Sequence, residues 1–273
     1  MNRLLVVILG LCSSAFVIAG DCKGRWSVTV ENSSVQYLET KAKIPVYVQL
    51  SSEIRRCAPQ GIYIRAGNRN DLSIMSGNDR LQGQIVDSGG AKSGIRTSKG
   101  MVMPLNQGRQ TKFWFEFPAA KYASAGRYDA NLTFSLVGIK PRVIKKEILA
   151  LNIHPYVELS LNGQNRKSTV VNFGEMTEGK SKVVDLSMSA NTLVDVYFSA
   201  DNEYLVHEDN SNSRVRYSMF LNNAKVDFNK PIPMHKLSYE KSSNSLKIIL
   251  GSIKKAQAGN YSDKITITAH AKP

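Results

Sequence analysis

The chain has 273 residues, of which 42% are hydrophobic, and its formal net charge is +14. This length suits one large or two ordinary domains and excludes a chain too short to bury a core. The charge is uneven, because residues 21–153 carry a net +10 and residues 154–273 a net +3. A basic half predicts anionic partners such as acidic glycans, phospholipid headgroups or extracellular nucleic acid, with solubility alone as the alternative.

Residues 1–20 predict a secretory signal peptide. Arg3 gives a positive start, the apolar run "LLVVILGL" follows, and small residues near Ala19 and Gly20 offer a cleavage site. The apolar run is too short to span a bilayer, and no later segment replaces it. We therefore expect an exported, soluble mature protein.

Two cysteines remain after the leader, since Cys12 lies within it. Cys22 and Cys57 form an even pair in an oxidising compartment, which predicts one disulfide; two free thiols are the alternative. Such a bond would stabilise the first half of the protein by about 3–4 kcal/mol in the chain-entropy model.

Short alternating runs such as "WSVTV", "IPVYVQL", "GIYIRA" and "KFWFEF" fill residues 21–153, separated by Gly, Asn, Ser and Asp. This pattern is typical of antiparallel strands in a sandwich or barrel, and helical periodicity is nearly absent. In "FWFEF" we expect Phe113, Phe115 and Phe117 on the core face and Trp114 on the other.

The stretch "SGGAKSGIRTSKGMVMPLNQGRQ" is the first candidate for ligand binding. It joins a Gly/Ser segment to basic and apolar residues between two turn regions, and long loops on rigid sandwiches commonly carry function. The alternative is a buried strand whose basic neighbours are solvated. A second candidate, "RRCAPQGIYIRAGNRN", surrounds Cys57 with arginines, although a solvated basic edge explains this stretch better. The candidate ligand-binding residues are Arg96, Lys99, Met101, Val102, Met103 and Arg109.

The second half repeats the first. "AGRY" and "AGNY" place Gly126 and Gly259 at equivalent positions, and "RWSVTVENSS" and "YVELSLNGQN" open the two halves in the same way. We therefore expect two immunoglobulin-like Greek-key β-sandwiches, residues 21–153 and 154–273. Tyr128 and Tyr261 resemble the tyrosine corner of such sandwiches.

The two halves differ at their ends. In the first, the strand "NLTFSLV" is followed by another, "RVIKKEILALNI", whereas the equivalent strand "KITITA" of the second has no successor. A sandwich that lacks a strand exposes apolar side chains and unpaired backbone groups. The second sandwich is therefore predicted to be incomplete and to take a strand from a partner.

The motifs "NFGEMTEG" and "AGNYSDKITIT" resemble the spore coat protein U type of pilin domain, which builds archaic chaperone–usher pili. The first half fits this pattern more loosely, because Asp129 follows its tyrosine directly and no "NFG" counterpart is present. A two-domain chain resembles the tip subunit, or adhesin, of such pili. The resemblance implies donor-strand complementation by β-strand addition.

The implied partners are a periplasmic pilus chaperone, an usher, the next subunit donating its N-terminal strand, and a host, abiotic or anionic surface ligand at the extracellular pilus tip. Because Cys22 would tether the mature N-terminus, we expect the protein to accept a strand and to donate none. The residues expected to line the donor-strand groove, chosen by alternation, are Phe173, Leu186, Val196, Phe198, Ile265 and Ile267.

No residue pattern indicates catalysis. "GEMTEGKS" satisfies the phosphate-loop spacing, but a strand-like run follows it instead of a helix, and Glu175 and Glu178 would repel a nucleotide. The four histidines are far apart in sequence, and no hydrolase motif occurs. We expect no enzyme activity, no catalytic or metal site and no cofactor. The alternatives to a tip adhesin are a periplasmic pilus-assembly chaperone and a secreted carbohydrate-binding module.

Overall fold

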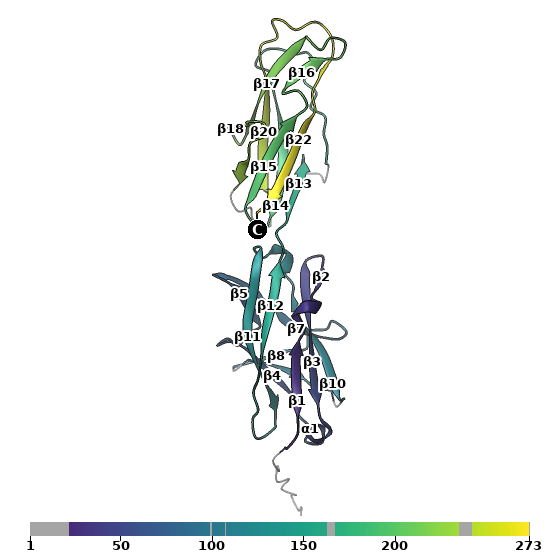
Figure 1. The fold of residues 1–273 in the computed structure, drawn as a ribbon, viewed down its shortest axis with the longest axis vertical. Helices are drawn as coiled ribbons and strands as arrows, with labels where there is room; N and C mark the ends of the chain where they lie inside the picture. The colour runs from purple at the N-terminus through teal and green to yellow at the C-terminus, as the bar shows by residue number, and fades with distance from the viewer. Residues whose placement is uncertain (1–21, 99, 107, 163–166, 235–241, 273) are drawn as a thin grey trace, which may run out of the picture.

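The computed structural model describes residues 22–98, 100–106, 108–162, 167–234 and 242–272; the expected signal peptide lies outside them. Figure 1 shows two bodies of β-strands stacked along the long axis, joined where β12 leads into β13. The predicted all-β sandwich class is confirmed.

The first sandwich has two antiparallel sheets. One has the order β1-β3-β10-β7, with β2 paired to β3; the other has the order β6-β5-β11-β4-β9-β8, with β12 paired to β11. The bounds in the first sheet are β1 (Trp26–Val30), β2 (Gln36–Leu38), β3 (Lys41–Leu50), β7 (Gln84–Asp87) and β10 (Gln110–Phe117). Those in the second are β4 (Gly61–Ala66), β5 (Ser73–Ser76), β6 (Asp79–Gln82), β8 (Ile95–Thr97), β9 (Gly100–Pro104), β11 (Gly126–Val137) and β12 (Lys145–Ile153). Helix α1 (Ser52–Arg56) and the 3-10 turns η1 (Asn32–Ser34) and η2 (Ala120–Tyr122) connect strands.

The second sandwich has one large and one small sheet. The large sheet has the order β13-β14-β20-β17-β16-β21, with β18 paired to β17, and the small sheet has the order β19-β15-β22. The large sheet contains β13 (Val157–Leu161), β14 (Ser181–Ala190), β16 (Tyr204–His207), β17 (Arg214–Leu221), β18 (Ala224–Lys225), β20 (Ser242–Leu250) and β21 (Tyr261–Ser262). The small sheet contains β15 (Val194–Ala200), β19 (Ile232–Met234) and β22 (Ile265–Ala271).

Strand alternation builds two separate cores. In β10, Phe113, Phe115 and Phe117 are fully buried, whereas Trp114 lies on the outer face beneath the Lys112 ammonium, 4.5 Å from its ring centroid. The first core ends at Ile153 and the second begins with buried residues of β14, so the two share no residue. We propose that each sandwich is a domain, divided between residues 153 and 154.

The repeated Ala-Gly-x-Tyr motif has the same geometry in both halves. Gly126 has φ +140° and Gly259 has φ +146°, a conformation that residues with a Cβ rarely adopt. The Tyr261 hydroxyl donates to the carbonyl oxygen of Gln257 (3.0 Å), and the Tyr128 hydroxyl is hydrogen-bonded to Ser124. Each tyrosine thus bonds a residue four positions upstream, as in a tyrosine corner.

A buried carboxylate on β10 is contacted from both neighbouring strands, β3 and β7. Glu116 is 5% exposed; its Oε2 lies 3.2 Å from Lys41 Nζ and 3.1 Å from Lys43 Nζ, and its Oε1 accepts a hydrogen bond from Gln84 (2.8 Å). Burial alone would raise the pKa of Glu116, but the bonds from Gln84 and the two lysines outweigh it and hold that pKa below its ordinary value.

Replacing this carboxylate tests the linkage between its charge and stability. Because the folded-state pKa is lowered, the stabilisation is present above the ordinary glutamate pKa and is lost as the pH falls through the folded-state value. Glu116→Gln is expected to lower the free energy of unfolding by about 1–3 kcal/mol at pH 7, with the difference shrinking below about pH 4. Chemical denaturation followed by tryptophan fluorescence measures this, with the exposed Asp129→Asn as control. A difference that stays constant down to pH 3 would contradict the assignment.

Candidate functional site

The second sandwich has an open side between two edge strands. β13 pairs only with β14, and β22 pairs only with β15, so within the described residues the outer edges of both strands are free. The two strands lie close together on opposite sheets. In the first sandwich, β11 occupies the place of β22, and β12 pairs along its second edge. The paired residues run from Gly126 with Ile153 to Phe134 with Lys145. The second sandwich has no described counterpart of β12.

The inward-facing side chains show the effect of this difference. In the first sandwich, β1 buries Trp26, Val28 and Val30, and β11 buries Leu132, Phe134 and Leu136. Their counterparts along the open side remain only partly buried, although all pack against the second core. They are Val157, Leu159 and Leu161 on β13, and Ile265, Ile267 and Ala269 on β22. We call these six residues the open groove.

The predicted groove residues divide into two groups. Ile265 and Ile267 lie on the wall formed by β22, and Phe173 is a partly buried residue of the segment before β14. By contrast, Leu186, Val196 and Phe198 are 0–1% exposed, so they belong to the closed core and offer no open surface. The β13 wall and Ala269 were missed, although "YVELSL" alternates in the same way as "WSVTV".

The apolar part of the predicted ligand-binding stretch is a strand. Met101 and Met103 on β9 are buried in the first core, and Val102 is partly exposed on the opposite face. The two methionines are therefore unavailable to a ligand, because β9 pairs with β4 and continues the sheet. The structure therefore supports the alternative given above, a buried strand in place of a ligand-binding loop.

The basic part of the stretch is dispersed. Arg96 on edge strand β8 pairs with Met101 and is exposed. Arg109 is exposed in the turn before β10, where its carbonyl oxygen accepts a hydrogen bond from Leu50 N (3.0 Å). Lys99 lies outside the described residues. The structure does not bring Arg96 and Arg109 together with an exposed apolar cluster.

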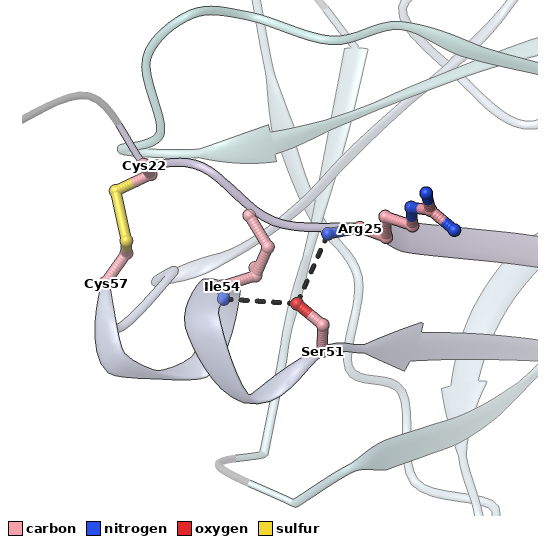
Figure 2. Close-up of a disulfide and its surroundings, with 5 residues drawn as sticks. All are labelled: Cys22, Arg25, Ser51, Ile54 and Cys57. Atoms are coloured by element: carbon pink, nitrogen blue, oxygen red, sulfur yellow. Dashed lines mark hydrogen bonds between the residues drawn. A yellow bond between two sulfur atoms is a disulfide. The ribbon is translucent and has the colours of Figure 1, made fainter.

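The predicted disulfide is confirmed and lies at the end of the first sandwich remote from the second (Figures 1 and 2). Cys22 bonds Cys57, which caps helix α1, with the two Cα atoms 6.2 Å apart. Figure 2 shows how Ser51 strengthens this attachment: its Oγ accepts hydrogen bonds from the backbone N of Arg25 (3.2 Å) and of Ile54 (3.4 Å). The Cys22 N also donates to the carbonyl oxygen of Lys140 (3.1 Å). The chain from Cys22 onward is thus held on the first sandwich.

The stretch with phosphate-loop spacing runs directly into strand β14. Asn172 Oδ1 accepts a hydrogen bond from Gly174 N (2.7 Å), and Gly179 N donates to Leu250 O (3.0 Å), so the segment forms a turn beside the sheet. The helix that a phosphate loop needs is replaced by a strand. Within the residues that the structure describes, no group of three or more His, Cys, Asp or Glu side chains could hold a metal ion. No helix of the described chain is long and apolar enough to cross a membrane.

No family model and no curated protein matches the chain. Among solved structures, it is similar to a chain of the CsuC–CsuE chaperone–tip adhesion subunit complex from Acinetobacter baumannii Csu pili, an archaic chaperone–usher system (14% identity, 77% of this chain and 84% of that chain, TM-score 0.41). It is also similar to a mutant of the CFA/I adhesin CfaE from enterotoxigenic Escherichia coli (10%, 93% and 90%, TM-score 0.41). A further similar structure is the CupB6 tip adhesin from Pseudomonas aeruginosa (11%, 92% and 88%, TM-score 0.30).

Proposed function

We propose that this protein is the two-domain tip adhesin of a chaperone–usher pilus, that it passes through the periplasm to the cell surface, and that it catalyses no reaction. The observation that carries this proposal is the open groove. Over the described residues, one edge of β13 and one edge of β22 have no partner strand, and the inward apolar residues of both strands are only partly buried. Exposed edge strands promote association, and natural proteins usually cover them. A partner strand on β22 would complete the second sandwich as β12 completes the first.

The donor strand would act through two kinds of contact. The free N–H and C=O groups of β22 would pair with the backbone of the donor, which gives affinity. Alternate apolar side chains of the donor would enter between Leu159 on β13 and Ile267 on β22, which sets register. Each donor side chain that becomes fully buried would contribute about 1.5–3 kcal/mol. A pilus chaperone would supply this strand first, and the next subunit would supply it after passage through the usher.

The attachment of the N-terminal segment supports a place at the tip. Residues from Cys22 to β1 are fixed by the disulfide and by the hydrogen bonds of Ser51 and Lys140, so they cannot extend into another subunit. The first sandwich, with its large positive charge, is then left to contact a surface ligand.

The proposal can be tested with a strand that the chain itself contains. A copy of residues 145–153, the sequence of β12, is joined through a Gly/Ser linker to the C-terminal end of the 21–273 protein. We expect the second sandwich to become resistant to limited proteolysis and to gain a cooperative thermal transition by circular dichroism. The tryptophan-detected transition should not move, because Trp26 and Trp114 both lie in the first sandwich.

A matched control keeps the length of the added strand and removes its apolar face. In this version the extension carries Leu149→Ser, Leu151→Ser and Ile153→Ser, at the positions that β12 buries. It should give no protection. If the unextended protein is already a protease-resistant monomer and the β12 copy adds nothing, the second sandwich is closed. The result would then favour a secreted binding module.

A further inference from the structure

The first sandwich contains a cationic pocket, and three of its lining residues (Tyr63, Arg65 and Asn70) belong to the second stretch that the sequence offered for ligand binding. It has a volume of about 420 Å³ and lies on the outer face of the sheet that contains β4 and β11. Its polar lining residues are Tyr63, Arg65, Asn70, Ser98, Thr133 and Arg142. This volume lies in the range of about 300–1,000 Å³ that is typical of small-molecule sites.

Strand register and one loop assemble this pocket. Arg65 on β4 is paired with Thr133 on β11, and Tyr63 is paired with Ser135. These residues face outward because Ile62 and Ile64 alternate with them and are buried. Arg142 comes from the loop between β11 and β12 and lies over the same face. Two arginines distant in sequence therefore line one cavity.

Arg142 is held in position before any ligand arrives. Its Nε donates a hydrogen bond to Ser135 Oγ (3.2 Å), and its guanidinium carbon lies 5.6 Å from the centroid of the Tyr63 ring. This arrangement uses the inner nitrogen and leaves the terminal nitrogens for two oxygens of one anionic group, which a guanidinium binds through two parallel hydrogen bonds.

The pocket is cationic and uncompensated. Within the part of the chain that the structure describes, no acidic residue lines the pocket, and neither Arg65 nor Arg142 forms an ion pair. Hydroxyl and amide side chains (Ser98, Thr133 and Asn70) supply hydrogen-bonding groups suited to sugar hydroxyls. The lining therefore fits an anionic group carried on a polar, hydroxyl-rich body.

We infer that this pocket binds one acidic sugar unit of an anionic polysaccharide, with its carboxylate or sulfate held by Arg65 and Arg142. The inference rests on the proposed adhesin function and names the class of surface ligand. Thr133 and Ser135 lie in the half of β11 that is farther from the junction, since Gly126 begins β11 at the second sandwich, where Ala125 N donates to Asn191 O. The pocket therefore lies toward the end of the molecule that would face a surface.

Binding is measured by biolayer interferometry of the 21–273 protein on immobilised hyaluronate, dextran sulfate, neutral dextran and duplex DNA at 150 mM salt. We expect binding to one or both acidic polysaccharides and none to dextran; the stronger of the two identifies carboxylate or sulfate as the anion. Arg65→Gln and Arg142→Gln should each weaken binding at least tenfold. Arg142→Lys, which keeps the charge and loses the paired geometry, should also weaken it severalfold.

Arg127→Gln is the matched control, because Arg127 is an exposed arginine on β11 outside the pocket. It removes the same charge and should change the affinity less than twofold. Equal losses in all three glutamine variants, or DNA bound as tightly as the polysaccharides, would show non-specific attraction and overturn the inference. An unchanged tryptophan-detected unfolding midpoint shows that each variant is folded. Neither result depends on the added-strand experiment, so the two proposals can fail separately.

Discussion

Removing the disulfide is expected to destabilise the first sandwich by about 3–4 kcal/mol, the loop-closure contribution for the 35-residue separation of Cys22 and Cys57. Cys22→Ser frees the N-terminal segment from helix α1, so the unfolded chain gains more freedom than the folded one. For a domain of this size the midpoint should fall by roughly 10–15 °C. Thermal unfolding followed by tryptophan fluorescence isolates the effect, since both tryptophans lie in the first sandwich.

Two controls fix the interpretation of this loss. Cys57→Ser should give the same midpoint as Cys22→Ser, and the double variant should be no less stable than either. A reducing agent should lower the wild-type midpoint to that of the variants and leave theirs unchanged. An unchanged midpoint in Cys22→Ser would contradict the loop-closure contribution, because that contribution acts on the unfolded chain whatever hydrogen bonds hold the segment in the folded one.

Gly259→Ala is expected to destabilise the second sandwich strongly, by about 3–5 kcal/mol. Gly259 has φ +146°, and a Cβ placed there would overlap the ring of His207. That ring is buried; its Nε2 is hydrogen-bonded to Ala258 O (3.0 Å), and its Nδ1 accepts a hydrogen bond from Asp209 N (3.0 Å). Moving it would break both bonds.

The equivalent glycine of the first sandwich provides the comparison. Gly126 has nearly the same φ, but a Cβ there would meet only Ser76 Oγ, at 3.3 Å. Gly126→Ala should therefore lower the free energy of unfolding only by the cost of holding alanine at this φ, about 1–3 kcal/mol. Both are measured in the protein extended with the β12 copy, by urea denaturation followed by circular dichroism for Gly259→Ala and by tryptophan fluorescence for Gly126→Ala. Equal losses at the two positions would show that backbone conformation alone matters and that His207 yields easily.

The sequence was sufficient where local patterns decide the structure. Alternation placed Phe113 and Phe115 in the core, and the repeated Ala-Gly-x-Tyr motif identified the two tyrosine corners. The disulfide followed from compartment and cysteine parity. Each of these features depends on neighbouring residues or on a short list of possible partners.

The sequence was insufficient where the exposure of a residue depends on strands that are distant along the chain. A period of two is the same in a central strand and in an edge strand, so alternation could not separate the buried Val196 from the partly open Ile267. The sequence left the run at Met101 open between an exposed binding loop and a buried strand, and the pairing of β9 with β4 decides for the strand. The pocket joins Arg65 to Arg142 through sheet register, and no spacing in the chain indicates that meeting.

The pairing of β11 with β12 also has a mechanical meaning. The chain leaves the first sandwich through Ile153 at the end of β12, so a pull on the second sandwich enters along the axis of that strand. Antiparallel hydrogen bonds lie perpendicular to the strands, and a lengthwise pull therefore loads the whole ladder in shear instead of opening it one bond at a time. If the far half of the first sandwich is attached to a surface, flow pulls the molecule lengthwise. That is the direction in which the β11–β12 hydrogen bonds must break together.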